Sequence, residues 1–386
     1  MPQVINGPAW EKDCRFRKRK RKPCCWSTKS ANGRRLSLPR VSDAPPERPK
    51  RRLRYGGKNP RRFQDKYKEH APERYSEDVA KVLASGKTPA GSHRPIMVAE
   101  ILAALAPVPG ELVVDCTLGY GGHARELLQA VQPGGRLIGL DVDPLELPKT
   151  EARLRALGFD ESALIVRRSN FAGLAPLLAT EAPTGANLIL ADLGVSSMQI
   201  DDPTRGFTFK TDGPLDLRMN PQRGQPASAF LATISAPKLT DLLTLNADEP
   251  EAIRLARAIH AAGSITTTLA LARVIRAELS KSPSVEPEKI EICIRRVFQA
   301  LRIEVNDEFG ALDTFLRHLP GCLAPGGRVA ILTFHSGEDR RVKHAFKAGL
   351  VEGAYSSIAE DITRSSVAEV RSNPRSSSAK LRWARR

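Results

Sequence analysis

The chain has 386 residues, of which 41% are hydrophobic, and a formal net charge of +17 at pH 7. It has enough apolar residues to bury a core, and no apolar run reaches the ~18 to 20 residues that cross a bilayer, which excludes mostly disordered, collagen-like and membrane-spanning classes for most of the chain. The six cysteines are too scattered for a disulfide framework or a zinc site, so we expect a reducing, intracellular compartment.

The positive charge is concentrated at the N-terminus. Residues 1–90 contain 25 of the 60 Lys and Arg residues but only nine of the 43 Asp and Glu residues, a net charge of +16. We interpret 1–60 as a disordered basic arm and 61–92 as a partly helical extension. The arm favours a nucleic-acid partner, and a solvated tail or a start codon placed too far upstream explains it equally well. Acidic residues interrupt the arm, so we expect a cytoplasmic protein, with organelle import as the lesser alternative.

From residue 93 onward, helical and strand-like patterns alternate. Helices are predicted over 95–106, 124–131 and 151–157. Short apolar strands are predicted between and after them, over 112–115, 136–141, 163–166 and 188–191. This alternation is typical of a parallel, doubly wound α/β sheet of Rossmann-like type.

The alternation stops after about residue 200. Five helices are then predicted, over 227–234, 238–245, 249–262, 269–279 and 287–301. A helix over 307–319 and a strand over 328–334 resume the sheet pattern. We therefore predict a helical subdomain over 205–302, inserted into a sheet domain that 93–204 and 303–386 form together.

A glycine-rich turn follows the first predicted strand, in the segment Asp115-Cys-Thr-Leu-Gly-Tyr-Gly-Gly-His123. Glycines let the backbone approach a ligand, and the next helix offers free N–H groups. Asp141, at the end of the next strand, could accept hydrogen bonds from ribose hydroxyls. The pattern fits NAD as well as S-adenosylmethionine, and a turn without a ligand is a third reading. Asp115 favours the methyl donor, because a carboxylate repels a pyrophosphate but suits a cationic, amine-bearing ligand.

Two further acidic segments follow predicted strands. Asp192 precedes a loop of small residues and would face a cofactor and a substrate together at the carboxyl edge of the sheet. Capping of the following turn is the alternative. His335, with Glu338 and Asp339 behind it, invites a metal site, but a helix start capped by Ser336 explains these residues better. We therefore predict no metal.

A series of short motifs runs from residue 93 to residue 378. It comprises His93-Arg-Pro-Ile-Met-Val, 115–123, Leu193-Gly-Val-Ser-Ser197, 201–209, 212–219, Arg223-Gly-Gln225, 298–303, 324–328, Phe334-His-Ser336 and Asn373-Pro-Arg-Ser-Ser-Ser378. In this order the motifs closely resemble the small-subunit ribosomal RNA (cytosine-N(4)-)-methyltransferase H family. The resemblance implies a class I methyltransferase sheet with an inserted helical domain.

The resemblance also implies a cofactor and a reaction. S-adenosylmethionine would be held by residues that match the family in type, namely Gly121, Gly122, His123, Asp141, Phe171, Asp192 and Gln199. The reaction would be methylation of the exocyclic 4-amino group of a cytidine in small-subunit ribosomal RNA, free or in the assembled subunit. The chain departs from the family in its basic N-terminal segment and in a shorter segment between Lys347 and Arg371, which puts substrate contacts from that loop in doubt.

The amino nitrogen of cytosine is a weak nucleophile because its lone pair is delocalised into the ring. A carboxylate that accepts an amino hydrogen would favour an attacking nitrogen and then help remove the proton. We assign this role to Asp192, with Ser196, Ser197 and His335 as weaker candidates for holding the base. Methylation at ring carbon 5 needs a cysteine nucleophile, typically one that follows a proline. It is not expected here, because the only Pro-Cys pair, Pro23-Cys24, lies in the basic arm.

The target base must be single-stranded or extruded to reach such a pocket. We expect the inserted helices and the cations of the preceding loop to grip the RNA, namely Arg205, Lys210, Arg218 and Arg223. A structural ion pair between Asp216 and Arg218 is an equal alternative. Two rival functions are an NAD-linked oxidoreductase and a non-catalytic RNA-binding protein of ribosome assembly.

Overall fold

The computed structural model describes residues 95–282 and 285–386, which all belong to one unit of the chain, Gly56–Arg386. The basic arm predicted over 1–60 and the extension predicted over 61–92 lie outside the described residues. Among the described helices, none combines the length and the apolar character that crossing a membrane requires.

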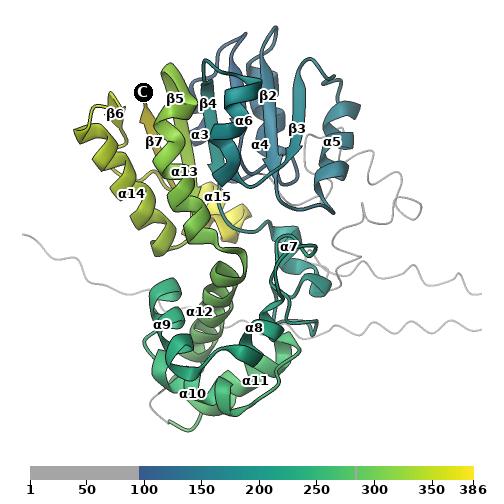
Figure 1. Ribbon diagram of the computed structural model, residues 1–386, viewed down its shortest axis with the longest axis vertical. Helices are drawn as coiled ribbons and strands as arrows, with labels where there is room; N and C mark the ends of the chain where they lie inside the picture. The colour runs from purple at the N-terminus through teal and green to yellow at the C-terminus, as the bar shows by residue number, and fades with distance from the viewer. Residues whose placement is uncertain (1–94, 283–284) are drawn as a thin grey trace, which may run out of the picture. The chain divides into compact units, whose positions relative to one another are not determined.

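A seven-stranded sheet organises the described residues (Figure 1), with the order β3-β2-β1-β4-β5-β7-β6. Its strands are β1 (Leu112–Asp115), β2 (Arg136–Asp141), β3 (Leu164–Arg168), β4 (Ala186–Asp192), β5 (Leu323–Thr333), β6 (Ser357–Ile358) and β7 (Lys380–Arg385). The first five are parallel, and β7 is antiparallel to β5 and β6. The predicted Rossmann-like class I methyltransferase sheet is thus confirmed. The chain runs outward from β1 through β2 to β3 and then crosses back to β4 on the other side of β1, and ligands bind at such a reversal of strand order.

The central strands are apolar because helices cover both faces of the sheet. One face packs on α3 (Val98–Leu105), α4 (Gly122–Ala130) and α5 (Leu147–Ala156). The opposite face packs on α6 (Leu174–Glu181), α13 (Glu308–Cys322) and α14 (Ser336–Val351). Successive residues of β1 serve opposite faces, since Val113 joins the first core and Val114 the second. Loops at the strand ends are therefore held by two packed layers.

Five helices between β4 and β5 share a core of their own (Figure 1), and they are α8 (Ala227–Thr233), α9 (Ala236–Ala247), α10 (Ala252–Ala261), α11 (Thr268–Leu279) and α12 (Pro287–Asn306). Leu239, Leu255, Ile275 and Val297 meet in this core. The last helix does not end near residue 301 as predicted. It continues to Asn306 and stops where Asp307 turns left-handed, with φ 49°. The boundary predicted at residue 302 therefore falls inside a helix.

The C-terminal elements correct the sequence prediction further. The pattern predicts none of β6, β7 and α15 (Val367–Ser372). The strand predicted over 328–334 starts earlier, at Leu323, because the turn at 324–327 is absorbed as an irregularity where the register against β4 shifts. β7 then pairs with residues 328–333 of β5. The C-terminus thus adds a strand beside the half of β5 that leads to the site.

Candidate active site at the carboxyl ends of the strands

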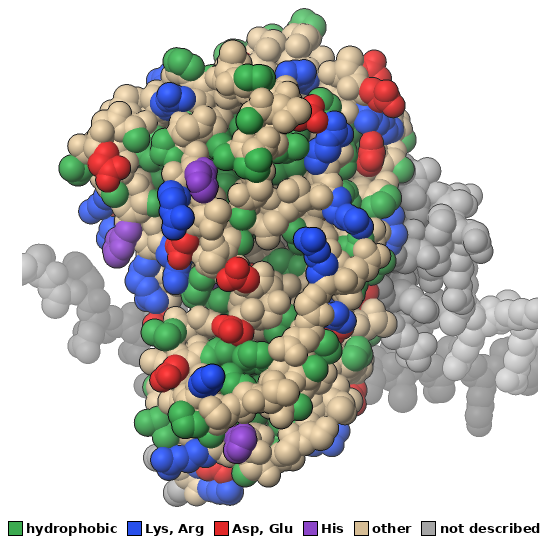
Figure 2. All heavy atoms as spheres, in the orientation of Figure 1, with side chains coloured by type: hydrophobic (Ala, Val, Ile, Leu, Met, Phe, Trp, Pro, Cys, Tyr) green, Lys and Arg blue, Asp and Glu red, His purple; other side chains and the backbone are tan. Residues whose placement is uncertain are grey.

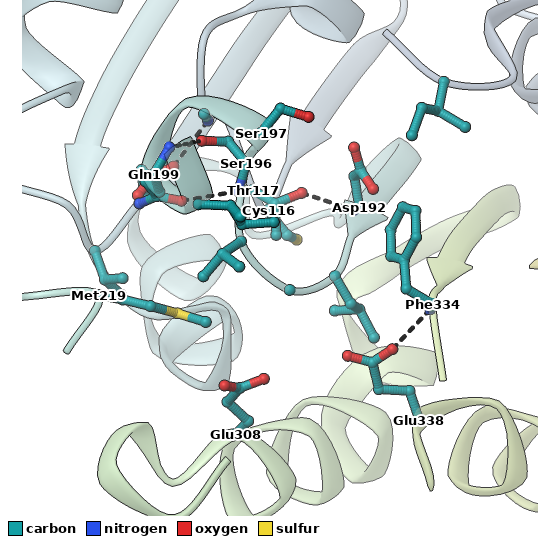
Figure 3. Close-up of a pocket in the computed structure, with 18 of the residues that line it drawn as sticks. Cys116, Thr117, Asp192, Ser196, Ser197, Gln199, Met219, Glu308, Phe334 and Glu338 are labelled. Carbon is teal, nitrogen blue, oxygen red and sulfur yellow. Dashed lines mark hydrogen bonds between the residues drawn. The ribbon is translucent and has the colours of Figure 1, made fainter. Parts of the chain in front are cut away.

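A cavity of about 480 Å³ lies at the carboxyl ends of β1, β2, β4 and β5 (Figure 3). Two groups of residues face each other across it. The strand-end loops supply one side, which we call the sheet wall and which includes Thr117, Asp141, Asp192 and Phe334. The loop before α8 and the end of α12 supply the insert wall, which consists of Met219, Gln299, Arg302 and Asn306. The site is therefore shared between the sheet and the inserted helices.

The glycine turn after β1 is shaped by close packing. Gly121 has φ 74°, and a Cβ added there would lie 2.9 Å from Cγ2 of Thr150 in α5. A Cβ on Gly122 would lie 2.9 Å from Cγ of Pro95. Gly122 and His123 line the cavity, whereas Gly121 is not among the described residues that do so. Of the three predicted cofactor residues in this turn, Gly121 thus shapes the site without facing it.

Asp141 ends β2 and holds the glycine turn in place by a hydrogen bond. One carboxylate oxygen accepts a hydrogen bond from the backbone N–H of Gly119 at 2.8 Å, and the other from the N–H of Asp143 at 2.8 Å. Burial raises the pKa of this carboxyl. Since each oxygen retains a second lone pair, Asp141 can still accept a ligand hydroxyl in the cavity that it lines.

Phe171 and Gln199 also line the cavity. Phe171, in η2 (Phe171–Gly173), packs edge-on against Phe315 with ring centroids 5.4 Å apart. The amide of Gln199, in α7 (Ser197–Asp201), is engaged at both ends. Its Nε2 donates to Asp143 at 2.8 Å and its Oε1 accepts from the N–H of Ser196 at 2.9 Å. One N–H and one lone pair of Gln199 remain for a ligand.

Asp192 ends β4 and projects into the cavity (Figure 3). Its backbone N–H donates to Oγ1 of Thr117 at 2.7 Å, which ties β4 to the turn after β1. Its Oδ1 is buried without a hydrogen-bond partner among the described residues, and burial together with the charge of Glu338 raises its pKa to about 7. The capping alternative fails, because Ser196 is the N-cap of the following helix.

His123 leaves the charge of Asp192 uncompensated. Its Nε2 lies 2.9 Å from the carbonyl oxygen of Ile96, and a carbonyl can only accept, so this nitrogen carries the ring proton. Burial lowers the pKa of His123, which keeps the ring neutral and its Nδ1 without a proton. Nδ1 therefore cannot donate to Oδ2 of Asp192, 3.6 Å away. Nearby Asp115 is also buried, and its pKa is raised to about 6.

The two serines after Asp192 line the cavity (Figure 3). Ser196 caps α7, since its Oγ accepts from the N–H of Gln199 at 3.2 Å in a reciprocal capping box. Ser197 is the first residue of that helix. The predicted role of both serines in holding a base stays a prediction, and the hydroxyl of Ser196 already serves the helix.

His335, not Ser336, caps α14. Its Nδ1 accepts from the N–H of Glu338 at 3.4 Å, and Glu338 accepts from the N–H of Phe334 at 2.8 Å. Burial opposes ionisation of Glu338, but the hydrogen bond with His335 and the charge of Arg302 hold its pKa below the usual value. Ser336 instead donates to Asp248 at 3.0 Å. The helix start predicted here is correct, but its capping residue is corrected.

Glu308, His335 and Glu338 each offer a ligand atom within 4.8 Å of the others. Their other contacts account for this grouping. Arg302 donates to both oxygens of Glu308, at 2.7 and 2.9 Å, and Glu338 belongs to the helix cap. Asp339 pairs with Lys380 and Arg382 instead of joining the group. The prediction that no metal is used here stays a prediction.

A family model described as the MraW methylase family matches residues 90–386. The chain belongs to the MraW methylase family. Ribosomal RNA small subunit methyltransferase H 2 of Alkaliphilus metalliredigens is 48% identical over 343 residues, covering 88% of this chain and 98% of the relative. Ribosomal RNA small subunit methyltransferase H 1 of Lachnoclostridium phytofermentans is 48% identical over 340 residues, covering 87% and 92%. Ribosomal RNA small subunit methyltransferase H of Halorhodospira halophila is 41% identical over 324 residues, covering 79% and 97%.

In this member of the MraW methylase family, two of the four cations predicted to grip RNA are occupied within the protein. Arg205 is only 7% exposed, and its guanidinium donates to Asp143 at 2.8 Å and to the carbonyl of Met219 at 2.7 Å. This corrects the prediction for Arg205, because its buried guanidinium is used within the protein and is not presented to RNA. Arg218 makes two hydrogen bonds to Asp216, at 2.7 and 2.8 Å, so the alternative of an ion pair is what the structure shows.

Lys210 and Arg223 are exposed and stay candidates for RNA contact. On the face drawn in Figure 2, Lys and Arg side chains are spread over the surface with acidic side chains between them, and they do not gather in one patch. This spread agrees with the near balance of charges after residue 90. RNA contact by this part of a MraW methylase would therefore depend on individual cations and on shape.

Several residues of the site escape sequence reasoning. Asp143 organises Gln199 and Arg205, and the segment Asp141-Val-Asp143 was a signal that could have pointed to it. Arg302 and Glu308 form a pair across the break between α12 and α13. No helical spacing predicts that pair, because the chain turns at Asp307 between them.

Proposed function

We propose that this protein transfers a methyl group from S-adenosylmethionine to the exocyclic 4-amino group of a cytidine in small-subunit ribosomal RNA. The observation that carries the proposal is Asp192, a half-buried carboxylate at a strand end whose buried Oδ1 has no hydrogen-bond partner among the described residues and whose pKa is raised to about 7. The names of the relatives support a small-subunit RNA substrate. A cytoplasmic location belongs to the same proposal.

The sheet wall fits the cofactor in shape and charge. Side chains at Gly121 and Gly122 would clash with Thr150 and Pro95, so the turn stays close to the start of α4, where N–H groups are free. Asp141 would accept ribose hydroxyls. Surplus negative charge suits a ligand with a sulfonium and an ammonium group, and it disfavours the pyrophosphate of NAD. When bound, the cofactor supplies an electrophilic methyl group.

Asp192 acts on the amino group of the base. Its carboxylate accepts one amino hydrogen, which localises the nitrogen lone pair, and it takes the proton as the nitrogen becomes positively charged. A raised pKa makes it a stronger base than an ordinary aspartate. The neutral ring of His123 and the uncompensated burial maintain that pKa.

The two walls enclose the reacting groups between them. Phe334 and Met219 offer apolar surfaces from opposite sides (Figure 3), and Phe171 adds a third to the lining of the cavity. Such walls exclude water and hold an extruded base near Asp192. A cytidine can bring its amino group to Asp192 only when it is single-stranded or flipped out of a duplex, in free RNA or within the assembled subunit.

A labelling experiment tests the proposal. Small ribosomal subunits from cells that lack the modification are incubated with the full chain and with S-adenosylmethionine carrying a labelled methyl group, and the RNA is then digested to nucleosides. We expect label in N4-methylcytidine and none with Asp192→Ala. Label in another nucleoside would show that a different atom is methylated. The absence of label would favour the non-catalytic alternative.

A binding experiment separates the two cofactors. We expect S-adenosylhomocysteine at a hundredfold excess over its Kd to add about 3 kcal/mol to the free energy of unfolding and so to raise the melting temperature. NAD should leave the melting temperature unchanged. Stabilisation by NAD alone would instead support the oxidoreductase.

A further inference from the structure

One buried ion pair links the two walls of the cavity. Nη1 of Arg205 lies 2.8 Å from Oδ2 of Asp143, and the two residues are 7% and 1% exposed. Neither is among the described residues that line the cavity. The pair therefore cannot touch a ligand there, and any effect that it has on the reaction is exerted through its neighbours.

On the side of the sheet wall, the pair is joined to the cofactor residues. Asp143 donates its N–H to Asp141, whose other oxygen holds the glycine turn through Gly119. The same Oδ2 of Asp143 that meets Arg205 also accepts from Gln199 at 2.8 Å. A ligand that binds to Asp141 or Gln199 therefore contacts a residue that is hydrogen-bonded to Asp143.

On the side of the insert wall, Arg205 holds the loop that presents Met219. Its Nη2 donates to the carbonyl of Met219 at 2.7 Å. The N–H of Met219 donates to Asn306 at 2.7 Å, and Asn306 donates to the carbonyl of Leu217 at 2.8 Å. Leu217 has φ 64°, a conformation that a branched residue keeps only when its surroundings hold it.

We propose that Arg205 is a positioning residue that couples cofactor binding on the sheet wall to the placement of Met219 on the insert wall. The planar guanidinium can do this because it donates to Asp143 and to the Met219 carbonyl from two different nitrogens. The consequence is that small-subunit RNA binds more tightly when the cofactor is present. This inference rests on the proposed function.

The test compares binding with and without cofactor in the full chain. For the wild type we expect S-adenosylhomocysteine to tighten binding of unmodified small subunits about tenfold. Arg205→Lys keeps the charge next to Asp143, but its single nitrogen cannot span Asp143 and the Met219 carbonyl as the two terminal nitrogens of the guanidinium do. We expect it to retain the affinity for S-adenosylhomocysteine and the KM for S-adenosylmethionine within about threefold, to lose the tightening, and to lower kcat about tenfold.

Two further variants separate the loss of the link from the effect of leaving a buried charge unpaired. Arg205→Ala leaves Asp143 as a buried, unpaired charge, so the double variant Asp143→Asn/Arg205→Gln, which removes both charges, is measured beside it. The matched control is Arg340→Ala, because Arg340 also joins the sheet side to the insert through Asp248, but both residues are about half exposed. We expect this control to keep the full tightening.

Two outcomes would overturn the coupling. One is equal RNA affinity of the wild type with and without S-adenosylhomocysteine, and the other is full tightening in Arg205→Lys. Failure of the proposed function looks different, because the wild type would then transfer no label to small subunits in any condition.

Discussion

The sheet wall and the insert wall of the cavity treat their charged residues in opposite ways. On the sheet side, Asp115 and the Oδ1 atom of Asp192 are buried, and neither carboxylate pairs with a Lys or Arg among the described residues. Their pKa values are raised to about 6 and about 7. On the insert side, charges are matched within the protein, Arg302 by Glu308 and Arg218 by Asp216. One wall keeps reactive charge available and the other neutralises its own.

This difference has a physical reason. Strand ends are held by backbone hydrogen bonds and two packed layers, so an uncompensated carboxylate can be kept there at a cost that the rest of the sheet offsets. The loop before α8 has no such ladder, and ion pairs and the side chain of Asn306 hold it in place. The sheet wall is therefore suited to chemistry and the insert wall to placing a substrate.

Removing the reactive charge should break this contrast most severely. Asp192→Asn keeps the size of the side chain but cannot take a proton, and we expect methyl transfer to fall about 10² to 10⁴-fold. Affinity for S-adenosylhomocysteine should stay within about threefold. The matched control is Asp313→Asn, an exposed acid that pairs with Arg341. Near-normal turnover of Asp192→Asn with bound cofactor would rule out the role as base.

The same charge predicts the pH dependence. Only the ionised form of Asp192 accepts the amino hydrogen, so the single-turnover rate should rise with pH up to about 7 and level off above it. One unit below that value, the rate should be about tenfold lower. The rate is measured with labelled cofactor, and circular dichroism verifies that the protein stays folded. A flat profile over this range would contradict the assignment.

A glycine from each region sharpens the comparison of packing. Gly121 in the sheet domain and Gly263 in the insert have φ 74° and 69°, but a Cβ would meet α5 only at Gly121. Gly263→Ala should lower the free energy of unfolding by about 1 kcal/mol and Gly121→Ala by about 2 to 4 kcal/mol. Urea denaturation measures both. Equal losses would show that the contact with Thr150 can relax.

Arg218 tests whether the insert wall is as self-contained as its pairs indicate. Arg218→Ala should lower the free energy of unfolding by about 1 kcal/mol, because a hydrogen-bonded, partly buried pair is lost. Affinities for RNA and for S-adenosylhomocysteine, measured separately, should each change less than about threefold. A large loss of RNA affinity at unchanged stability would return Arg218 to the RNA contacts.

The smallest effects are expected at the exposed cations of the insert loop. Lys210→Ala and Arg223→Ala should each weaken RNA binding about two- to threefold at low salt, and the double variant should reduce the salt dependence. Filter binding over a range of salt concentrations measures this. Arg155→Ala, in α5, is the matched control. If the control weakens binding as much, the effect reflects net charge and not contact.

The sequence predicted the sheet side of the molecule well. Apolar runs that end in Asp115, Asp141 and Asp192 are local patterns, and parallel strands bring such ends together whatever the loops do. The C-terminal strand β7 was missed, because Lys380–Arg385 alternates charged and apolar residues only over a short length. The caps were also misjudged, since His335 rather than Ser336 caps α14.

By itself the sequence determined which strands carry the site residues, the glycine turn and the acids at the strand ends, because each of these depends on neighbours a few residues away. Only the tertiary structure decided which charges remain available. Arg205 and Asp143 are 62 residues apart in the chain and touch because two loops converge. A cation predicted to meet RNA thereby became a buried tie between the walls, since pairing depends on distances in space that no local pattern encodes.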